Sequence, residues 1–121
     1  MSNIDKQNFD NVLEKRLEKI IDTLSEKGEE YSSDHNIFHT FDVAGRINRE
    51  KPREALWGMA MKHLVSVIDI IHSDDDELDI QMIDEKFGDL INYLILAEIM
   101  IKEDYKLHSM MSEIFSFQDE I

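Results

Sequence analysis

The sequence predicts an all-α fold, a compact antiparallel bundle of four to five helices, and three observations support this prediction. The chain has one proline and four glycines, so few positions interrupt a helix. Apolar residues recur at intervals of three and four, which is the period of a helix that buries one face. A length of 121 residues suits a single domain, residues 1–121, that can bury a core without disulfides.

The chain is organised around residues 82–101, MIDEKFGDLINYLILAEIMI, which we interpret as the central helix. Glu85, Asp89 and Asn92 are spaced at i, i+4 and i+7, so they share one stripe of that helix. From Tyr93 onward almost every position is apolar, so this half should be covered on all sides. Two acids and an amide one turn apart suit Mg²⁺, but they are also typical of a half-exposed helix face.

Residues 5–27 predict the first helix, because their apolar residues form a continuous stripe with three- and four-residue spacing. Gly28 is expected to end this helix, and residues 28–104 would then form the core of the bundle. We expect the stripe to face the core or a second subunit. Its members are Phe9, Val12, Leu13, Leu17, Ile20, Ile21 and Leu24.

Residues 28–36, GEEYSSDHN, have no period and favour turns. Asp34 or Asn36 would cap a short helix over residues 37–47. The segment is either an ordinary connection or a binding loop, since loops carry binding residues more often than helices do. The polar candidates of such a loop are Tyr31, Ser32 and Asp34.

Pro52 begins the next predicted helix, which runs to about residue 72, because proline is favoured in the first helical turn. The acidic stretch 73–79, SDDDELD, is then a short turn that makes this helix and the central helix antiparallel neighbours. Asp79 would cap the central helix. The turn lacks the spaced glycine and terminal glutamate of a calcium loop, so we interpret it as solvated.

The helix over residues 52–72 has its own polar stripe, which includes Lys62 and Asp69. At about 1.5 Å per residue from the turn, Lys62 lies level with Asp89, and Asp69 lies near the turn. If the two stripes face each other, Asp69, Glu85 and Asp89 approach one cation with Lys62 nearby. If they face outward, Lys62 and Asp89 form at most a surface pair that contributes little.

The central helix is expected to continue to about residue 104. Residues 105–121 alternate apolar and polar positions, and they form either a last amphipathic helix or a contact with another subunit. Glu98 falls on the apolar face of the central helix, where an unpaired buried carboxylate would be costly. It is therefore either an edge or interface residue that pairs with a Lys or Arg, or a ligand on the wall of a pocket.

The composition excludes several classes of function. The chain has 27 Asp and Glu residues and 13 Lys and Arg residues, which gives a net charge of −14. A surface with this charge repels nucleic acid and anionic membranes. The longest apolar run is too short to span a bilayer, and no signal peptide is visible. The chain has no cysteine, which fits a cytoplasmic protein. Its five histidines lack the spacing of a zinc site.

Several sequence elements together resemble those of short phage and prophage proteins. Those proteins in turn resemble the MazG-like all-α nucleoside triphosphate pyrophosphatases and the nucleotide-modification-associated domains. The resemblance covers about residues 27–101. The elements are KGEEYSSD at 27–34, Phe38 and Phe41, MKH at 61–63, and EKFGDLINY at 85–93.

The resemblance implies a bundle that assembles as a homodimer or larger homo-oligomer and hydrolyses a (deoxy)nucleoside triphosphate to pyrophosphate and a monophosphate. In such enzymes Mg²⁺ neutralises phosphate charge and activates the attacking water. By position, Glu85 and Asp89 would be the catalytic metal ligands, with Asp69 as a third ligand. Asn92 would orient a ligand or the nucleotide, and Lys62 would meet phosphate. Tyr31 would stack on the base, and Ser32 and Asp34 would help to close the pocket.

The sequence departs from the enzyme pattern in its acids. Lys86 stands three residues before Asp89, where the pattern has an acid, and the preceding helix offers Asp69 in place of a pair of acids. Three hypotheses follow. The chain is a phage-type Mg²⁺-dependent pyrophosphohydrolase, a non-catalytic module of the same fold that sequesters or senses a nucleotide, or an acidic phage inhibitor that binds a basic host protein in the host cytoplasm.

Overall fold

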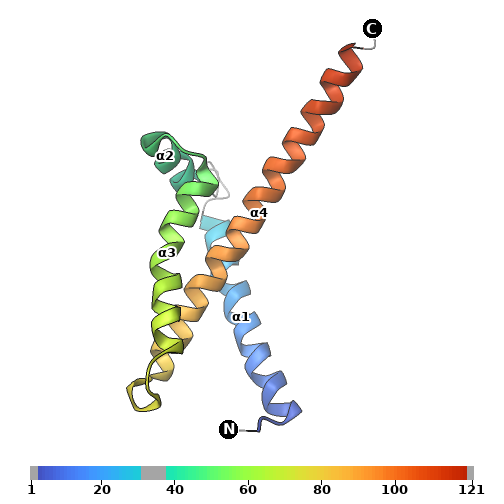
Figure 1. Ribbon diagram of the computed structural model, residues 1–121. Coiled ribbons are helices and arrows are strands. Elements are labelled where there is room, and N and C mark those ends of the chain that lie inside the picture. Colours follow the sequence, from blue (N-terminus) through green and yellow to red (C-terminus); the bar gives the residue numbers. More distant parts are fainter. Residues whose placement is uncertain (1–2, 31–37, 120–121) are drawn as a thin grey trace.

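The computed structural model describes residues 3–30 and 38–119, and within these residues every regular element is helical (Figure 1). The prediction of an all-α bundle of four to five helices is confirmed. The elements are α1 (Lys6–Glu30), α2 (His39–Asn48), α3 (Pro52–Ile71), the 3₁₀ turn η1 (Asp75–Glu77) and α4 (Ile80–Asp119).

α3 and the first half of α4 form the centre of the bundle as antiparallel neighbours, as the short acidic turn predicts. Asp79 caps α4, since its Oδ1 accepts the backbone N–H of Gln81 at 3.0 Å. The core is built around Leu56, Leu96 and Met100, which are at most 8% exposed. The side chains packed against these three residues are Leu24, Phe38, Phe41, Tyr93 and Ala97.

α2 folds back onto α3 through a tight corner. Arg49 ends α2 in the left-handed conformation, with φ 57° and ψ 46°. Gly45 is buried where the chain turns, and a Cβ at this position would lie 2.8 Å from the carbonyl oxygen of Glu50. Only glycine therefore lets the backbone of α2 approach the start of α3 this closely.

Two predicted helix ends are wrong. Gly28 does not stop α1, which continues to Glu30; among the described glycines none has a positive φ, so Gly28 does not form the left-handed cap of a helix end. The central helix also does not end near residue 104. α4 is one helix of 40 residues, about 60 Å long, and residues 105–121 therefore begin inside it.

The apolar core of the described residues reaches along α4 as far as Met100, about the middle of this helix. In Figure 1 the second half of α4 projects away from α2 and α3, and α1 leans against α4 near the opposite end. In the part of the chain that the structure describes, no helix combines the length and apolar character that crossing a bilayer requires.

Candidate functional site: the cleft between α1 and α4

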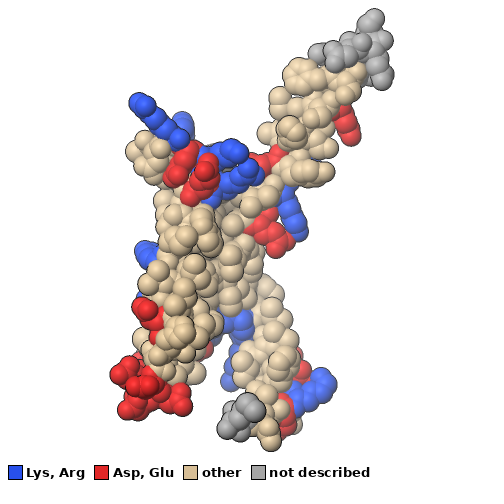
Figure 2. Space-filling view, viewed as in Figure 1, with Lys and Arg blue, Asp and Glu red and all other residues tan. Residues whose placement is uncertain are grey.

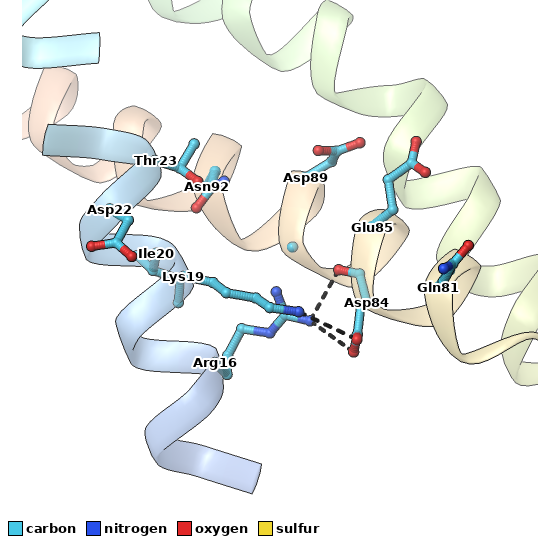
Figure 3. Close-up of a pocket in the computed structure, with 11 residues that line it drawn as sticks. Arg16, Lys19, Ile20, Asp22, Thr23, Gln81, Asp84, Glu85, Asp89 and Asn92 are labelled. Atoms are coloured by element: carbon cyan, nitrogen blue, oxygen red, sulfur yellow. Dashed lines mark hydrogen bonds and ion pairs between the residues drawn. The ribbon is translucent and has the colours of Figure 1, made fainter. Parts of the chain in front are cut away.

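A cleft of about 460 Å³ lies between α1 and the first half of α4 (Figure 3). Its volume is in the range of small-molecule sites. Charged and amide side chains line it from both helices. Its lining residues are Arg16, Lys19, Ile20, Asp22, Thr23, Gln81, Asp84, Glu85, Gly88, Asp89 and Asn92.

Arg16 connects the two helices that line the cleft, because its side chain extends from α1 to the backbone of α4. Its Nη2 donates a hydrogen bond to the backbone carbonyl oxygen of Asp84 at 3.0 Å and lies 3.7 Å from Asp84 Oδ1. The Arg16 side chain is 21% exposed. A Cβ at position 88 would lie 2.6 Å from Arg16 Nη1, so Gly88 leaves the space that the guanidinium occupies.

Lys19 stands one turn further along α1 and is held less firmly. Its Nζ lies 3.3 Å from Asp84 Oδ2, and the two side chains are 59% and 44% exposed. Exposed pairs of this kind contribute about 0–1 kcal/mol. Figure 3 shows the Asp84 carboxylate turned toward both cations. An incoming anion could therefore replace Asp84 at Lys19 with little loss.

Glu85 and Asp89 leave α4 on the side away from Arg16 and Lys19 (Figure 3). Asp89 Oδ2 lies 3.5 Å from His63 Nδ1 of α3, and the His63 ring lies 5.0 Å from the ring of Tyr93. Glu85 is the more exposed of the two acids and pairs with Lys86 at 3.7 Å. Asp89 is thus the acid that a second helix holds in place.

Asn92 has an unsatisfied acceptor on the cleft wall. Its side-chain oxygen Oδ1 is buried and has no hydrogen-bond partner among the residues that the structure describes. An unmade hydrogen bond of a buried group costs about 1–3 kcal/mol. Because this oxygen is buried, a donor on a ligand in the cleft would recover this free energy only if the Asn92 side chain turned into the cleft.

The structure brings Glu85, Asp89 and Asn92 of the predicted site into one cleft. Lys62 and Asp69 do not line it, because both are exposed on α3. The predicted register is wrong by one residue, since His63 and not Lys62 meets Asp89. The helical phase explains this: α3 packs inward through Leu56, Ala60, His63 and Val67. The predicted Tyr31, Ser32 and Asp34 lie outside the described residues.

The acids do not form a complete cation site within the described residues, where no three His, Asp or Glu side chains gather around one point. Asp69 is therefore not joined to Glu85 and Asp89 as a preformed set of ligands. Mg²⁺ in proteins is often held by one or two carboxylates together with substrate phosphates. Glu85 and Asp89 fit an ion that arrives with a phosphate, and a resident Mg²⁺ stays a prediction.

Sequence reasoning missed the contribution of α1 to this site. Arg16 falls within the apolar stripe of α1, three residues after Leu13 and four before Ile20, where a cation must find a partner. Gly88, in the middle of a helix, was the matching signal, because glycine in a helix often marks a close approach. Together they point to an arginine of another element packed over the α4 backbone.

The chain matched no protein-family model, no curated protein and no solved structure.

Proposed function

We propose that this chain binds a phosphorylated nucleotide in the cleft between α1 and α4. The observation that carries the proposal is the arrangement of the cleft of about 460 Å³. Two cations of α1 line it, the buried and unsatisfied acceptor of Asn92 lies in its wall, and two acids of α4 stand at its edge with their side chains turned away from the cations. The resemblance of residues 27–101 to nucleotide-processing phage proteins supports the same choice of ligand.

Arg16 and Lys19 would receive the phosphate end. The net charge of −14 opposes anion binding in general, so the phosphate needs a local cluster of cations. Lys19 is exposed and weakly paired, and Arg16 keeps further N–H donors beyond the one that it gives to Asp84. A phosphate would therefore meet one preorganised guanidinium and one ammonium that can turn toward it.

Asn92, once its side chain turned into the cleft, would recognise a donor on the ligand, such as an amino or ring N–H group of a base. A buried acceptor discriminates strongly against a ligand that lacks the matching donor, because the acceptor then stays unpaired. Thr23 of α1 lies on the same cleft and offers a hydroxyl that can donate or accept. This end of the cleft would set which nucleotide binds.

Hydrolysis is a second candidate function, favoured by Glu85 and Asp89 one turn apart on the cleft wall. Because their side chains leave α4 on the side away from Arg16 and Lys19, these two carboxylates would hold Mg²⁺ only on a triphosphate that extends over this edge of α4. The bound ion would supply charge neutralisation and an activated water. His63 would keep the Asp89 carboxylate oriented. Release of pyrophosphate that is lost in both Glu85→Gln and Asp89→Asn would establish this function.

A thermal-shift screen of nucleotides, each with and without Mg²⁺, tests binding. A ligand at 100 times its Kd stabilises a protein by about 2.7 kcal/mol, which raises Tm by roughly 10 °C for a chain of this size. Lys19→Gln and Asn92→Leu should each reduce the shift. Lys27→Gln is the matched control, because Lys27 is also exposed on α1 but does not line the cleft.

The outcomes separate the three hypotheses. A shift that needs Mg²⁺ and disappears in Asp89→Asn supports a metal-nucleotide site. A shift without Mg²⁺ and without product supports a module that sequesters or senses its ligand. If no nucleotide shifts Tm, the proposal fails, and the acidic surface would be tested against basic host proteins. The exposed acids of the turn around η1, visible at the foot of α3 in Figure 2, would then be the first surface to test.

A further inference from the structure

We propose that a second copy of this chain covers its exposed apolar surfaces, with the C-terminal arm of each copy seated in an apolar groove of the other. The arm is residues 105–116 of α4, and the groove lies between the start of α1 and the start of α4. This inference does not rest on nucleotide binding.

The exposed area is the first argument. The chain exposes 9824 Å², whereas a folded monomer of 14.3 kDa exposes about 6,800 Å². The excess of about 3,000 Å² per chain exceeds half of an obligate homodimer interface, which buries about 2,000–5,000 Å² in total over both partners. The single chain therefore offers enough surface for a stable dimer.

The arm carries the apolar stripe of the core out of the bundle. Leu107, Met110 and Ile114 lie on the same side of α4 as the buried Leu96 and Met100, beyond an interruption at the acids Glu103 and Asp104. The three arm residues are 60%, 52% and 55% exposed. In Figure 2 the arm shows few charged side chains on the visible face. A stripe of this kind packs against another helix or sheet surface in folded proteins.

The groove is a mostly apolar hollow with a volume of about 390 Å³. Phe9 and Val12 of α1 form one side of it, and both are more than half exposed. Phe87 belongs to the α4 side. The remaining apolar lining residues are Ile4, Leu13, Ile83 and Ile91. The edge of the groove is formed by Arg16 and Asp84, which also line the proposed nucleotide cleft.

The positions of the two surfaces favour a second copy as the occupant. The arm projects from one end of the molecule, and the start of α1 lies toward the other end (Figure 1). Two chains placed antiparallel about a two-fold axis bring each arm to the groove of the other copy. Both surfaces are then used in both copies, so the assembly closes as a dimer and does not grow into a filament.

The mass of the full chain in solution tests the dimer. Light scattering should give twice 14.3 kDa for the wild type. Ile114→Glu on the arm and Val12→Glu in the groove should each give 14.3 kDa, because a charge would be buried in the contact. Ser112→Glu is the control, since Ser112 lies on the opposite face of the arm and the dimer should persist. Circular dichroism should show unchanged helix content in all three variants.

Cross-linking tests which surfaces meet. The chain has no cysteine, so introduced thiols report only on their own positions. Met111→Cys on the arm and Val12→Cys in the groove, when mixed, should be joined by a short bismaleimide into a mixed dimer. In the control, Met111→Cys is mixed with Val65→Cys, whose thiol lies on α3 outside the groove. These two variants should not be joined.

Three results would overturn the proposal. They are a wild type that stays monomeric at high concentration, a dimer that survives Ile114→Glu or Val12→Glu, and arms that link only to each other. High salt should leave the dimer intact, because its contact is apolar. A complex with a basic protein would weaken under the same conditions.

Discussion

α4 packs in two different ways against its two neighbours. Against α3 the contact is apolar and closed, and Leu56, Leu96 and Met100 are 0%, 8% and 4% exposed. Against α1 the contact is looser, and Arg16 crosses it to reach Asp84. None of the side chains that the structure describes on α1 is fully buried. The same helix thus has one side that stabilises the fold and one side that stays partly open.

This difference places the candidate site where the described helices are least tightly packed. Binding surfaces and moving elements come from regions with few buried contacts, because these regions can open at low free energy. The cleft and the apolar groove both lie at the α1 side of α4 and share Arg16 and Asp84. A ligand or a second chain bound there would order α1 without disturbing the α3 contact.

The largest effect is expected at the centre of the α3 contact. Leu56→Ala should lower the free energy of unfolding by about 2–5 kcal/mol, since Leu56 is 0% exposed and a cavity would remain. Urea denaturation measures this change. Val65→Ala on the same helix is the control, because Val65 is 54% exposed and the change should stay within about 0.5 kcal/mol. Equal losses in both variants would contradict the assigned core.

The next effect is expected at the corner between α2 and α3. A Cβ at Gly45 would meet three backbone atoms between 2.8 and 3.3 Å, which cannot move as easily as a side chain. Gly45→Ala should therefore destabilise the protein by about 1–3 kcal/mol. Gly58→Ala is the matched control in α3, where nothing lies within 4 Å of the added Cβ. It should stabilise the protein by about 0.5–1 kcal/mol, and thermal denaturation of the pair gives both values.

A smaller and local effect is expected on the α1 side. The Cβ of Gly88→Ala would displace the Arg16 guanidinium, which is the flexible end of a side chain. The lost hydrogen bond and the better helix propensity of alanine oppose each other, so global stability should change by no more than about 1–2 kcal/mol. Hydrogen exchange should instead accelerate in α1 alone.

Arg16→Gln sharpens this test, because it removes the same contact from the other side. Added to Gly88→Ala, it should cause little further acceleration of exchange in α1, since coupled residues are not additive. Additive effects would show that Gly88 and Arg16 act independently. Faster exchange in α3 as well would show that the two sides of α4 are not separate.

The sequence predicted the closed side of α4 better than the open side. The period of apolar residues and the short acidic turn were enough for an antiparallel α3–α4 pair, and Asp79 caps α4 as expected. The rotation of α3 about its own axis was not predicted, because it depends on how α3 packs against α4. A small rotation decides whether Lys62 or its neighbour His63 faces Asp89. His63 therefore took the place that Lys62 was expected to have opposite Asp89.

The candidate site was predicted only on the α4 half. Glu85, Asp89 and Asn92 share a stripe by spacing alone, which is local information. Arg16 and Lys19 meet Asp84 across more than 60 residues of sequence, and no local period encodes such a contact. The sequence also did not predict that α4 continues past residue 104. Its pattern of apolar residues after that point is the same for a separate amphipathic helix as for a continuation of α4.

The smallest effect concerns Glu98, which stands between the two halves of α4. It is exposed and pairs with Lys102 one turn later, so the edge interpretation holds and the pocket interpretation is wrong for the single chain. The hydrogen bond from Lys102 and the charge of Lys102 lower the pKa of Glu98 below its ordinary value of 4.5. The pair should therefore stabilise the fold above pH 4.5, and this contribution should disappear as the pH falls through the lowered pKa.

Carbon-detected NMR titration of the Glu98 carboxyl measures this pKa directly. Lys102→Ala should return it toward 4.5 and should leave Tm almost unchanged, because an exposed pair contributes little to stability. Lys106→Ala, a turn further along the arm, is the control and should leave the pKa of Glu98 lowered. A large loss of stability in Lys102→Ala would instead indicate that Glu98 lies in a buried contact with a second chain, which the proposed arm-and-groove dimer does not require.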